Sequence, residues 1–213
     1  MNTGFLYNSL LFSNGGYQLL NNLIPSLILV SLQNESTNQF EHAVPNKSKA
    51  ELPLLERGGQ PSRQLYSGSG DRALQEFYHD ANLISQLQAC TGLNLKPTGE
   101  QGSYSYYLHK GDYLGLHRDF HSCDVTLITT LYDQCSNKSK GGMLCLYPSR
   151  AWEPLNQILK TPLHGATLIR LKQGDSLVLL GGVVPHWVLP MQENEKRVTA
   201  LLCYCASELI VKL

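Results

Sequence analysis

The chain has 213 residues, 42% of them hydrophobic, and its formal net charge at pH 7 is zero. A chain of this length can bury a substantial core, and its composition is that of a globular protein. The neutral balance argues against a binder of nucleic acid or membrane surfaces that depends on bulk charge. We therefore expect no nucleic-acid partner and no membrane partner; the sequence leaves the oligomeric state open.

The start of the chain lacks the basic segment that opens a secretion signal, because its first Lys or Arg is Lys47. The apolar run 23–32 is interrupted by Pro25 and is too short to span a bilayer. We therefore expect a cytoplasmic protein whose cysteines are reduced thiols, and none of them forms a C-x-x-C pair. The six are Cys90, Cys123, Cys135, Cys145, Cys203 and Cys205.

The first part of the chain reads as helices and loops. Apolar residues in 17–31 follow the i, i+3, i+4 pattern of a helix, which Pro25 should end or kink. The polar segment 34–63 contains three prolines and is expected to be a long loop. A second helix should start near Asp71, a good N-cap residue, and close at Thr91-Gly92.

After about residue 100 the apolar pattern changes to a period of two, which is typical of strands. Glycine-containing turns separate eight short runs, and this arrangement favours a double-sheet jelly roll. We expect an α+β, mainly β domain over 1–213, with helices of 1–95 packed on one sheet of a 96–206 core. The expected strands are Ser103–His109, Tyr113–Asp119, Val125–Tyr132, Met143–Tyr147, Thr167–Leu171, Ser176–Leu180, Pro185–Leu189 and Arg197–Ala206.

Three residues have the chemistry of a ferrous site. His117 and Asp119 lie two apart, so on a strand both point to one face, and His186 would arrive from a distant strand. Two imidazoles and one carboxylate suit Fe(II) and leave part of the metal open for chemistry. A bare H-x-D also occurs by chance on strand surfaces. Zinc is an alternative metal, although a structural zinc site usually closes with four protein ligands.

Arg197 and Thr199 follow this site and share a strand face. A guanidinium binds a carboxylate through two parallel hydrogen bonds, and a hydroxyl adds a third, so the pair could anchor a dicarboxylate co-substrate. The alternative is an ordinary surface arginine. A phenol could also donate to the co-substrate, either from Tyr104 and Tyr106, which share a face, or from Tyr107 on the other face.

Three further polar residues are candidate substrate contacts. Arg118 alternates away from the metal face, so it should form a salt bridge on the sheet or reach round to a substrate carboxylate. His121 lies four residues after His117 and is either a neighbour of the site or a structural histidine. Asp124 lies near a strand end.

Several segments occur in the order found in a known superfamily: the run Tyr107-Leu-His-Lys-Gly-Asp-Tyr-Leu-Gly-Leu-His-Arg-Asp, then Gly-Gly-Met-Leu, Gly-Asp-Ser-Leu-Val, His186 and Arg197-Val-Thr. Over residues 95–206 the chain resembles the 2-oxoglutarate and Fe(II) dependent oxygenases. It is similar to their prolyl-hydroxylase-like branch. Through Cys123-Asp-Val-Thr-Leu-Ile-Thr and Gly142-Met-Leu-Cys-Leu-Tyr-Pro it also resembles the branch that hydroxylates or halogenates free amino acids.

The resemblance implies that His117, Asp119 and His186 bind Fe(II), and that Arg197 and Thr199 bind the far carboxylate of 2-oxoglutarate. O2 would be the oxidant, with ascorbate a candidate reductant. In radical halogenases Gly or Ala replaces the carboxylate ligand, so the presence of Asp119 favours hydroxylation. The first 95 residues match nothing in the family and are expected to hold substrate determinants.

We therefore expect a dioxygenase that hydroxylates an unactivated C–H bond of a small amino-acid-like metabolite. Two alternatives stay open. One is a peptidyl or prolyl-type protein hydroxylase, which an open groove beside the site would favour. The other is a non-catalytic jelly-roll binding module whose metal is structural or absent, because fold does not fix function.

Overall fold

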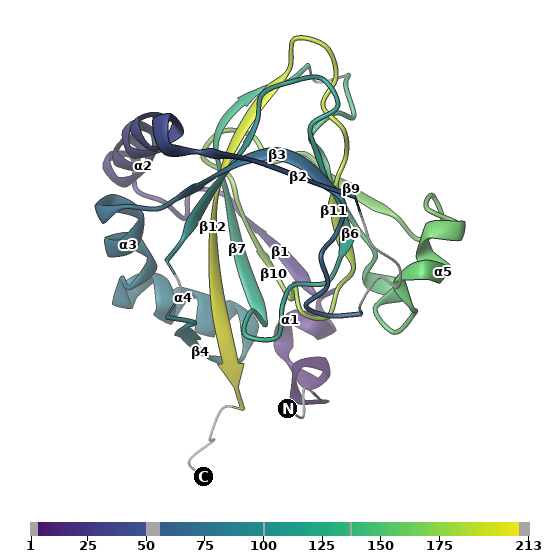
Figure 1. The fold of residues 1–213 in the computed structure, drawn as a ribbon. Coiled ribbons are helices and arrows are strands. Elements are labelled where there is room, and N and C mark those ends of the chain that lie inside the picture. Colours follow the sequence, from purple (N-terminus) through teal and green to yellow (C-terminus); the bar gives the residue numbers. More distant parts are fainter. Residues whose placement is uncertain (1–3, 50–55, 100, 137, 209–213) are drawn as a thin grey trace.

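A computed structural model describes residues 4–49, 56–99, 101–136 and 138–208. Their strands form one antiparallel sheet of twelve that curls around a central space (Figure 1). Along the curl the order is β1-β10-β7-β12-β5-β3-β6-β11-β8-β9, with β2 paired to β3 and β4 paired to β12. Because β3 pairs with both β5 and β6, it joins the two walls of the curl. This is the double-stranded β-helix, or jelly roll, expected from the sequence.

The strands are β1 (Tyr17–Leu20), β2 (Val44–Ser48), β3 (Arg63–Ser69), β4 (Asn94–Pro97), β5 (Ser103–Tyr107), β6 (Tyr113–His117), β7 (Val125–Gln134), β8 (Leu144–Leu146), β9 (Thr167–Ile169), β10 (Ser176–Leu179), β11 (His186–Val188) and β12 (Lys196–Ser207). All eight strands predicted after residue 100 are present, with ends that differ by a few residues. The period-two pattern located them well because each carries one face into the curl and one face out.

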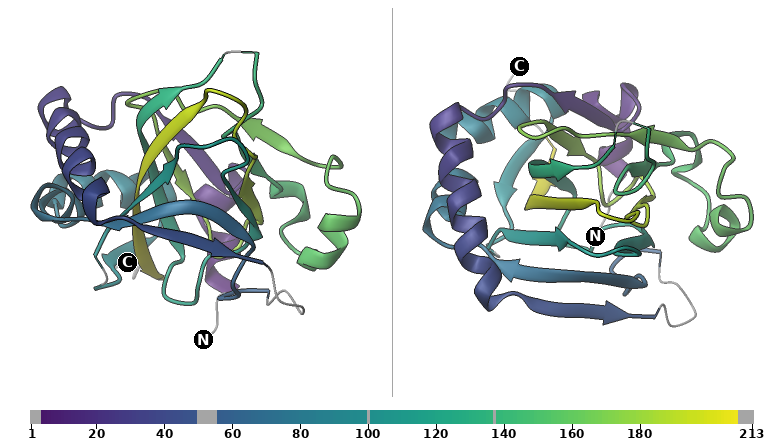
Figure 2. Two further views of the ribbon diagram at one scale, coloured as in Figure 1. Left: turned by 45° about the horizontal axis from the view of Figure 1, so that its top comes forward. Right: turned by 90° about the horizontal axis from the view of Figure 1, so that it is seen from above.

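The helices are α1 (Leu10–Ser13), α2 (Ser26–Gln39), α3 (Arg72–Tyr78), α4 (Ala81–Thr91) and α5 (Leu155–Lys160), with short 3-10 turns at Gly4–Asn8, Phe40–His42 and Pro148–Arg150. Helices α2, α3 and α4 cover the outside of the wall that contains β7 and β12 (Figures 1 and 2). The Gln33 side chain on α2 donates to the Leu131 carbonyl on β7, 2.8 Å away. The prediction that the leading helices pack on one sheet is confirmed.

The Glu35 carboxylate on α2 fastens this helical layer. It accepts hydrogen bonds from the backbone N–H groups of Asp71, Ala73 and Leu74, at the start of α3. A carboxylate there satisfies amides that the helix leaves unpaired and interacts favourably with the helix dipole. Tyr104 on β5 also donates to Glu35, at 2.7 Å. One half-buried acid therefore connects two helices and the sheet.

The structure corrects several predictions for the first part of the chain. Residues 17–20 form strand β1 instead of a helix, because the open edge of β10 pairs with them. The helix begins after Pro25 and runs on to Gln39. Strands β2 and β3 occupy parts of the expected 34–63 loop, of which residues 50–55 lie outside the described residues.

The predicted helix 71–91 is in fact two. Helix α3 ends at Tyr78, and α4 begins after Asp80, whose carboxylate accepts from the backbone N–H of Leu83 at 2.8 Å. Asp71 is the N-cap residue of α3, but its side chain makes no capping bond, because Glu35 fills that role. Gly92 closes α4 in the left-handed conformation, as the sequence indicated.

The prediction of reduced thiols is wrong for one pair. Cys123, just before β7, and Cys203, on β12, form a disulfide that closes a sequence separation of 80 residues. Neighbouring strands bring their Cα atoms to 5.1 Å, a proximity that spacing along the chain could not reveal. Cys90, Cys135, Cys145 and Cys205 are free. Cys145 is buried, and the other three are half-buried.

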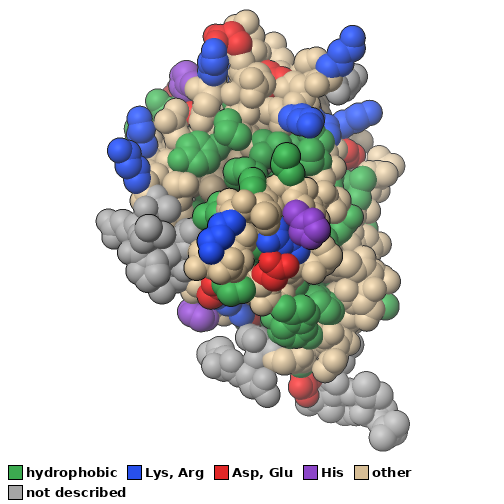
Figure 3. Space-filling model, turned by 90° about the vertical axis from the view of Figure 1, so that its right-hand side faces the viewer, with side chains coloured by type: hydrophobic (Ala, Val, Ile, Leu, Met, Phe, Trp, Pro, Cys, Tyr) green, Lys and Arg blue, Asp and Glu red, His purple; other side chains and the backbone are tan. Residues whose placement is uncertain are grey.

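Two surface properties bear on partners. No helix in the described part of the chain combines the length and apolar character needed to cross a bilayer. On the face shown in Figure 3, Lys and Arg side chains are spread in separate groups and form no continuous basic patch. The expected cytoplasmic location and single-domain organisation stay predictions.

Candidate active site

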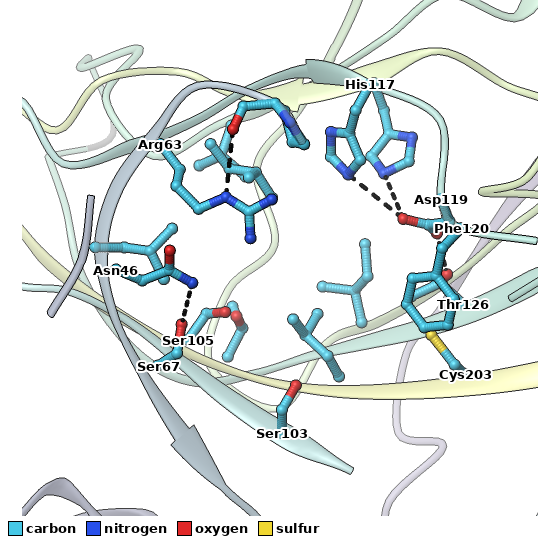
Figure 4. A pocket seen from close by; sticks show the side chains of 18 of the residues that line it. Asn46, Arg63, Ser67, Ser103, Ser105, His117, Asp119, Phe120, Thr126 and Cys203 are labelled. Carbon is cyan, nitrogen blue, oxygen red and sulfur yellow. Dashed lines mark hydrogen bonds and ion pairs between the residues drawn. The ribbon is translucent and has the colours of Figure 1, made fainter. Parts of the chain in front are cut away.

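A cavity of about 350 Å³ lies inside the curl (Figure 4). Its lining comes from both walls of the sheet and from β2 and β3, which lie over it. His117 and Asp119 stand together on one side of the cavity, and His186, which also lines it, is paired with His117 across the strands. Arg63 and Asn46 reach in from other sides. The charged side chains therefore meet in a shared enclosed space.

The three predicted metal ligands converge, and we call them the triad. His117 is the last residue of β6 and His186 the first of β11, and the two stand opposite each other in the strand pairing. Asp119 follows two residues after β6. Its Oδ1 lies 3.4 Å from Nε2 of His117 and 3.6 Å from Nε2 of His186. Potential ligand atoms of all three lie within 4.8 Å of one another.

Backbone carbonyls fix the orientation of both imidazoles. Nδ1 of His117 lies 2.9 Å from the Gly115 carbonyl, and Nδ1 of His186 lies 2.9 Å from the Val184 carbonyl. A carbonyl can only accept, so each Nδ1 carries the proton and each Nε2 presents its lone pair. This is how proteins commonly prepare a histidine to bind a metal.

The Asp119 carboxylate is held in a similar way. Its Oδ2 accepts a short hydrogen bond from the Thr126 hydroxyl, and its backbone N–H donates to the Gly181 carbonyl at 2.8 Å. Gly181 is required here, because a Cβ at that position would lie 1.8 Å from Oδ2. Oδ1 is thereby left to face the imidazoles.

The electrostatics of the triad favour an ionised carboxylate and shift the pKa values of the two imidazoles in opposite directions. Burial, followed by the nearby His186, lowers the pKa of His117. Burial raises the pKa of Asp119, but the two imidazoles together outweigh it, so that pKa lies below its usual range. Burial lowers the pKa of His186, but the attraction of Asp119 is stronger and the net pKa is raised. A carboxylate beside two imidazoles suits a divalent metal ion, and these residues fit iron.

A second polar group in the cavity, which we call the anion pocket, consists of Arg197, Thr199 and Tyr107. Only 1% of the Arg197 surface is exposed. Its Nη1 donates to the Gly142 carbonyl and its Nη2 to the Thr130 hydroxyl, whereas Nε is buried without a hydrogen-bond partner. A buried cation with an unused donor is suited to an anionic ligand, because leaving such groups unpaired is costly.

Of the three candidate tyrosines, Tyr107 is the one that lines the cavity. Tyr104 and Tyr106 point out of the cavity, and their hydroxyls donate to Glu35 and to the Ser36 carbonyl on α2. The structure therefore places these two hydroxyls away from the cavity in which a co-substrate would bind. Tyr107 lines the cavity and pairs with Arg197 across the strands. Burial raises the pKa of Tyr107 to about 12, so its hydroxyl remains a donor at neutral pH.

The candidate substrate contacts are placed elsewhere. Arg118 borders the cavity, but its guanidinium donates to the carbonyls of three residues and to the Glu56 carboxylate, which argues against substrate contact. Asp124 pairs with Arg57 at 2.6 Å and accepts from the backbone N–H of Ala206. His121 is exposed and does not belong to the cavity lining.

Sequence reasoning missed two residues of the site. Thr126 holds Asp119, and its position one residue into β7 gives no signal for this contact before the strands are placed. Arg63 opens β3 and points into the cavity, but the surrounding polar segment looked like a loop. Recognising Arg63 would have required seeing that Arg63, Leu65 and Ser67 alternate along a strand; all three line the cavity.

The comparisons with known proteins are structural. The sequence matches no protein-family model and no curated protein. The structure resembles a prolyl-4-hydroxylase of Pseudomonas putida, at 16% identity and a TM-score of 0.61 over 95% of this chain and 99% of that one. A prolyl hydroxylase of Trichoplax adhaerens, in complex with a hypoxia inducible factor peptide, is 19% identical, with a TM-score of 0.66 over 95% and 88% of the chains.

A third similar structure is the epimerase SnoN in complex with Fe3+, alpha ketoglutarate and nogalamycin RO. It is 12% identical, with a TM-score of 0.68 over 96% of this chain and 84% of that chain. The chain thus has the fold of the 2-oxoglutarate and iron dependent oxygenases, the superfamily that its sequence resembles. Its structural neighbours include the prolyl-hydroxylase-like branch.

Proposed function

We propose that this protein is an Fe(II) and 2-oxoglutarate dependent dioxygenase that hydroxylates an unactivated C–H bond. The observation that carries the proposal is the triad, whose three ligand atoms converge in a cavity that also contains a buried arginine with an unused donor. The similarity to SnoN, whose complex contains Fe3+ and alpha ketoglutarate, supports the same pair of ligands for this fold.

Different residues of the cavity would bind the metal and the co-substrate. His117, Asp119 and His186 would hold the iron, while the Gly115 and Val184 carbonyls and Thr126 keep the ligand atoms aimed. Arg197, with Thr199 and Tyr107, would hold the far carboxylate of 2-oxoglutarate through charge-assisted hydrogen bonds. When bound, iron and 2-oxoglutarate supply the oxidising chemistry with O2, and the cavity walls orient the substrate and exclude water.

The substrate we favour is a small amino-acid-like metabolite. The cavity volume of about 350 Å³ is within the usual range for small-ligand sites, about 300–1,000 Å³. The similarity to a prolyl hydroxylase in complex with a peptide supports the alternative, a peptidyl hydroxylase. The two differ in whether free amino acids or only peptides stimulate turnover.

The test is to reconstitute the purified protein with ferrous iron under anaerobic conditions and to measure iron content. Succinate release from 2-oxoglutarate is then followed after O2 is admitted, first alone and then with free amino acids and short peptides. We expect one iron per chain and a slow substrate-free release of succinate, both abolished by His186→Ala. If the folded protein neither retains iron nor turns over 2-oxoglutarate, it is a non-catalytic binding module.

A further inference from the structure

Arg63 is a second arginine of the cavity, close enough to Tyr107 of the anion pocket for each group to influence the pKa of the other. It is the first residue of β3, which crosses between the two walls, and its side chain points into the space beside the triad (Figure 4). Its Nε donates to the Pro61 carbonyl at 3.3 Å, a bond that steadies the side chain. The guanidinium is half-buried, so its charge is only partly shielded by solvent.

The charge of Arg63 is not neutralised within the described residues. No carboxylate among them lies within salt-bridge distance of it. Asp119 is the acidic side chain of the described cavity lining, and it belongs to the triad. Burial also lowers the pKa of Arg63. A partly buried cation without a partner costs stability, and a ligand of opposite charge would relieve that cost.

The other charged groups of the cavity are already committed if the proposed function is right, and the inference rests on it. One carboxylate of 2-oxoglutarate would bind at the metal with its 2-oxo group. The other would bind Arg197, which no described carboxylate reaches. The Arg118 guanidinium is used by carbonyls and by Glu56. Arg63 thus remains to bind an anion that is neither the co-substrate nor part of the protein.

We propose that Arg63 binds the carboxylate of the substrate, and that the substrate is a small organic acid with a free carboxylate, such as a free amino acid. A guanidinium binds a carboxylate through a two-pronged pair of hydrogen bonds, which fixes orientation as well as position. Asn46, Ser67 and Ser105 line the same part of the cavity and offer amide and hydroxyl groups to further polar atoms.

The opposite side of the cavity is suited to the rest of such a molecule. Phe120 follows Asp119 and lines the cavity next to the triad, with its side chain 40% exposed. Ile128 and Leu144 add further apolar lining. An acid held at Arg63 would direct its hydrocarbon part across the cavity toward the triad. An interior residue of a peptide lacks the free carboxylate, so this arrangement favours a free acid over a peptidyl substrate.

The test measures binding directly, without turnover. Zinc-substituted protein is saturated with N-oxalylglycine, an analogue of 2-oxoglutarate, and ligand-observed NMR records binding of each of the free amino acids and of its carboxamide. We expect at least one free amino acid to bind at least tenfold more tightly than its carboxamide. Arg63→Gln should remove about tenfold or more of that affinity, since a charge-assisted hydrogen bond contributes about 1.5–3 kcal/mol.

Two further variants separate a specific contact from a general effect. Arg63→Lys keeps the charge and should retain more of the binding than Arg63→Gln. Arg72→Gln removes a guanidinium from the exposed surface of α3, where it pairs with Glu76, and should leave binding unchanged. Melting temperatures of all three establish that each variant is folded.

Several results would overturn the proposal. The first is that no free amino acid binds more tightly than its carboxamide. The second is that the Arg63→Gln variant still prefers the free amino acid over the carboxamide. The third is that Arg63→Gln binds N-oxalylglycine more weakly than the wild-type protein does. The last would make Arg63 part of the co-substrate site. Failure of the proposed function would look different, because N-oxalylglycine would then not bind the wild-type protein at all. The comparison of each free amino acid with its carboxamide can still be made in the absence of N-oxalylglycine.

Discussion

The two sides of the cavity differ in how their polar groups are partnered. On the triad side, both imidazole Nδ1 atoms and Oδ2 of Asp119 are bound by groups of the protein. On the β3 side, Arg63 makes a single hydrogen bond through Nε and has no carboxylate partner in the described residues. Fully partnered groups hold one fixed arrangement, as a resident metal requires. Groups with unused donors are suited to a molecule that binds and leaves.

The largest effect is expected from removing the carboxylate of the triad. Asp119→Ala should weaken iron binding by more than about 100-fold, because loss of an outer partner alone typically costs 10–100-fold. Calorimetric titration with a divalent metal measures the change. The control is Glu193→Gln, which removes an exposed carboxylate paired with Lys110. If Asp119→Ala binds the metal as tightly as the wild-type protein, the triad is not the metal site.

The next effect concerns the anion pocket. Arg197→Gln should raise the KM for 2-oxoglutarate about 30-fold, since losing a charge-assisted hydrogen bond costs about 2 kcal/mol. Iron affinity should change far less. Because Arg197 is fully buried, its loss also threatens folding, and Arg197→Lys serves as the variant that keeps the charge. An equal KM in wild type and Arg197→Gln would show that the co-substrate binds elsewhere.

A smaller effect should follow from releasing the Asp119 carboxylate without removing it. Thr126→Val has nearly the same shape but lacks the hydroxyl that donates to Oδ2. Metal affinity should fall about tenfold, at the low end for an outer partner. Thr129→Val, on the same strand, loses a hydroxyl that contacts Ser176 instead, and provides the comparison. If both variants bind metal equally well, Thr126 does not position the ligand.

The smallest effect concerns Tyr107 and pH. Its folded-state pKa is raised above the ordinary value of about 10 to about 12. The Tyr107 hydroxyl therefore stays neutral below about pH 12, and its hydrogen bond to the co-substrate is lost only as pH rises through about 12. The KM for 2-oxoglutarate should show no titration of this residue up to about pH 10. Tyr107→Phe should raise KM about fivefold across that range. A rise in the wild-type KM near pH 10 that the variant lacks would contradict this.

The comparison also shows what the sequence could predict. The convergence of His117, Asp119 and His186 was predictable, because strand alternation and the order of the motifs constrain which face each side chain occupies. The position of Arg63 in the cavity was not predictable, because β3 is recognisable as a strand only when β2, β5 and β6 pair with it. The Cys123–Cys203 disulfide escaped for a similar reason, since it joins neighbouring strands that are distant in sequence.

The most direct measurement is an anaerobic absorption titration with Fe(II) and 2-oxoglutarate. A 2-oxo acid that chelates ferrous iron produces a visible charge-transfer band. We expect this band to saturate at one iron per chain, to be absent in His186→Ala, and to require more 2-oxoglutarate in Arg197→Lys. A folded wild-type protein that gives no band, or a band that His186→Ala leaves intact, would contradict a ferrous 2-oxoglutarate site at His117, Asp119 and His186.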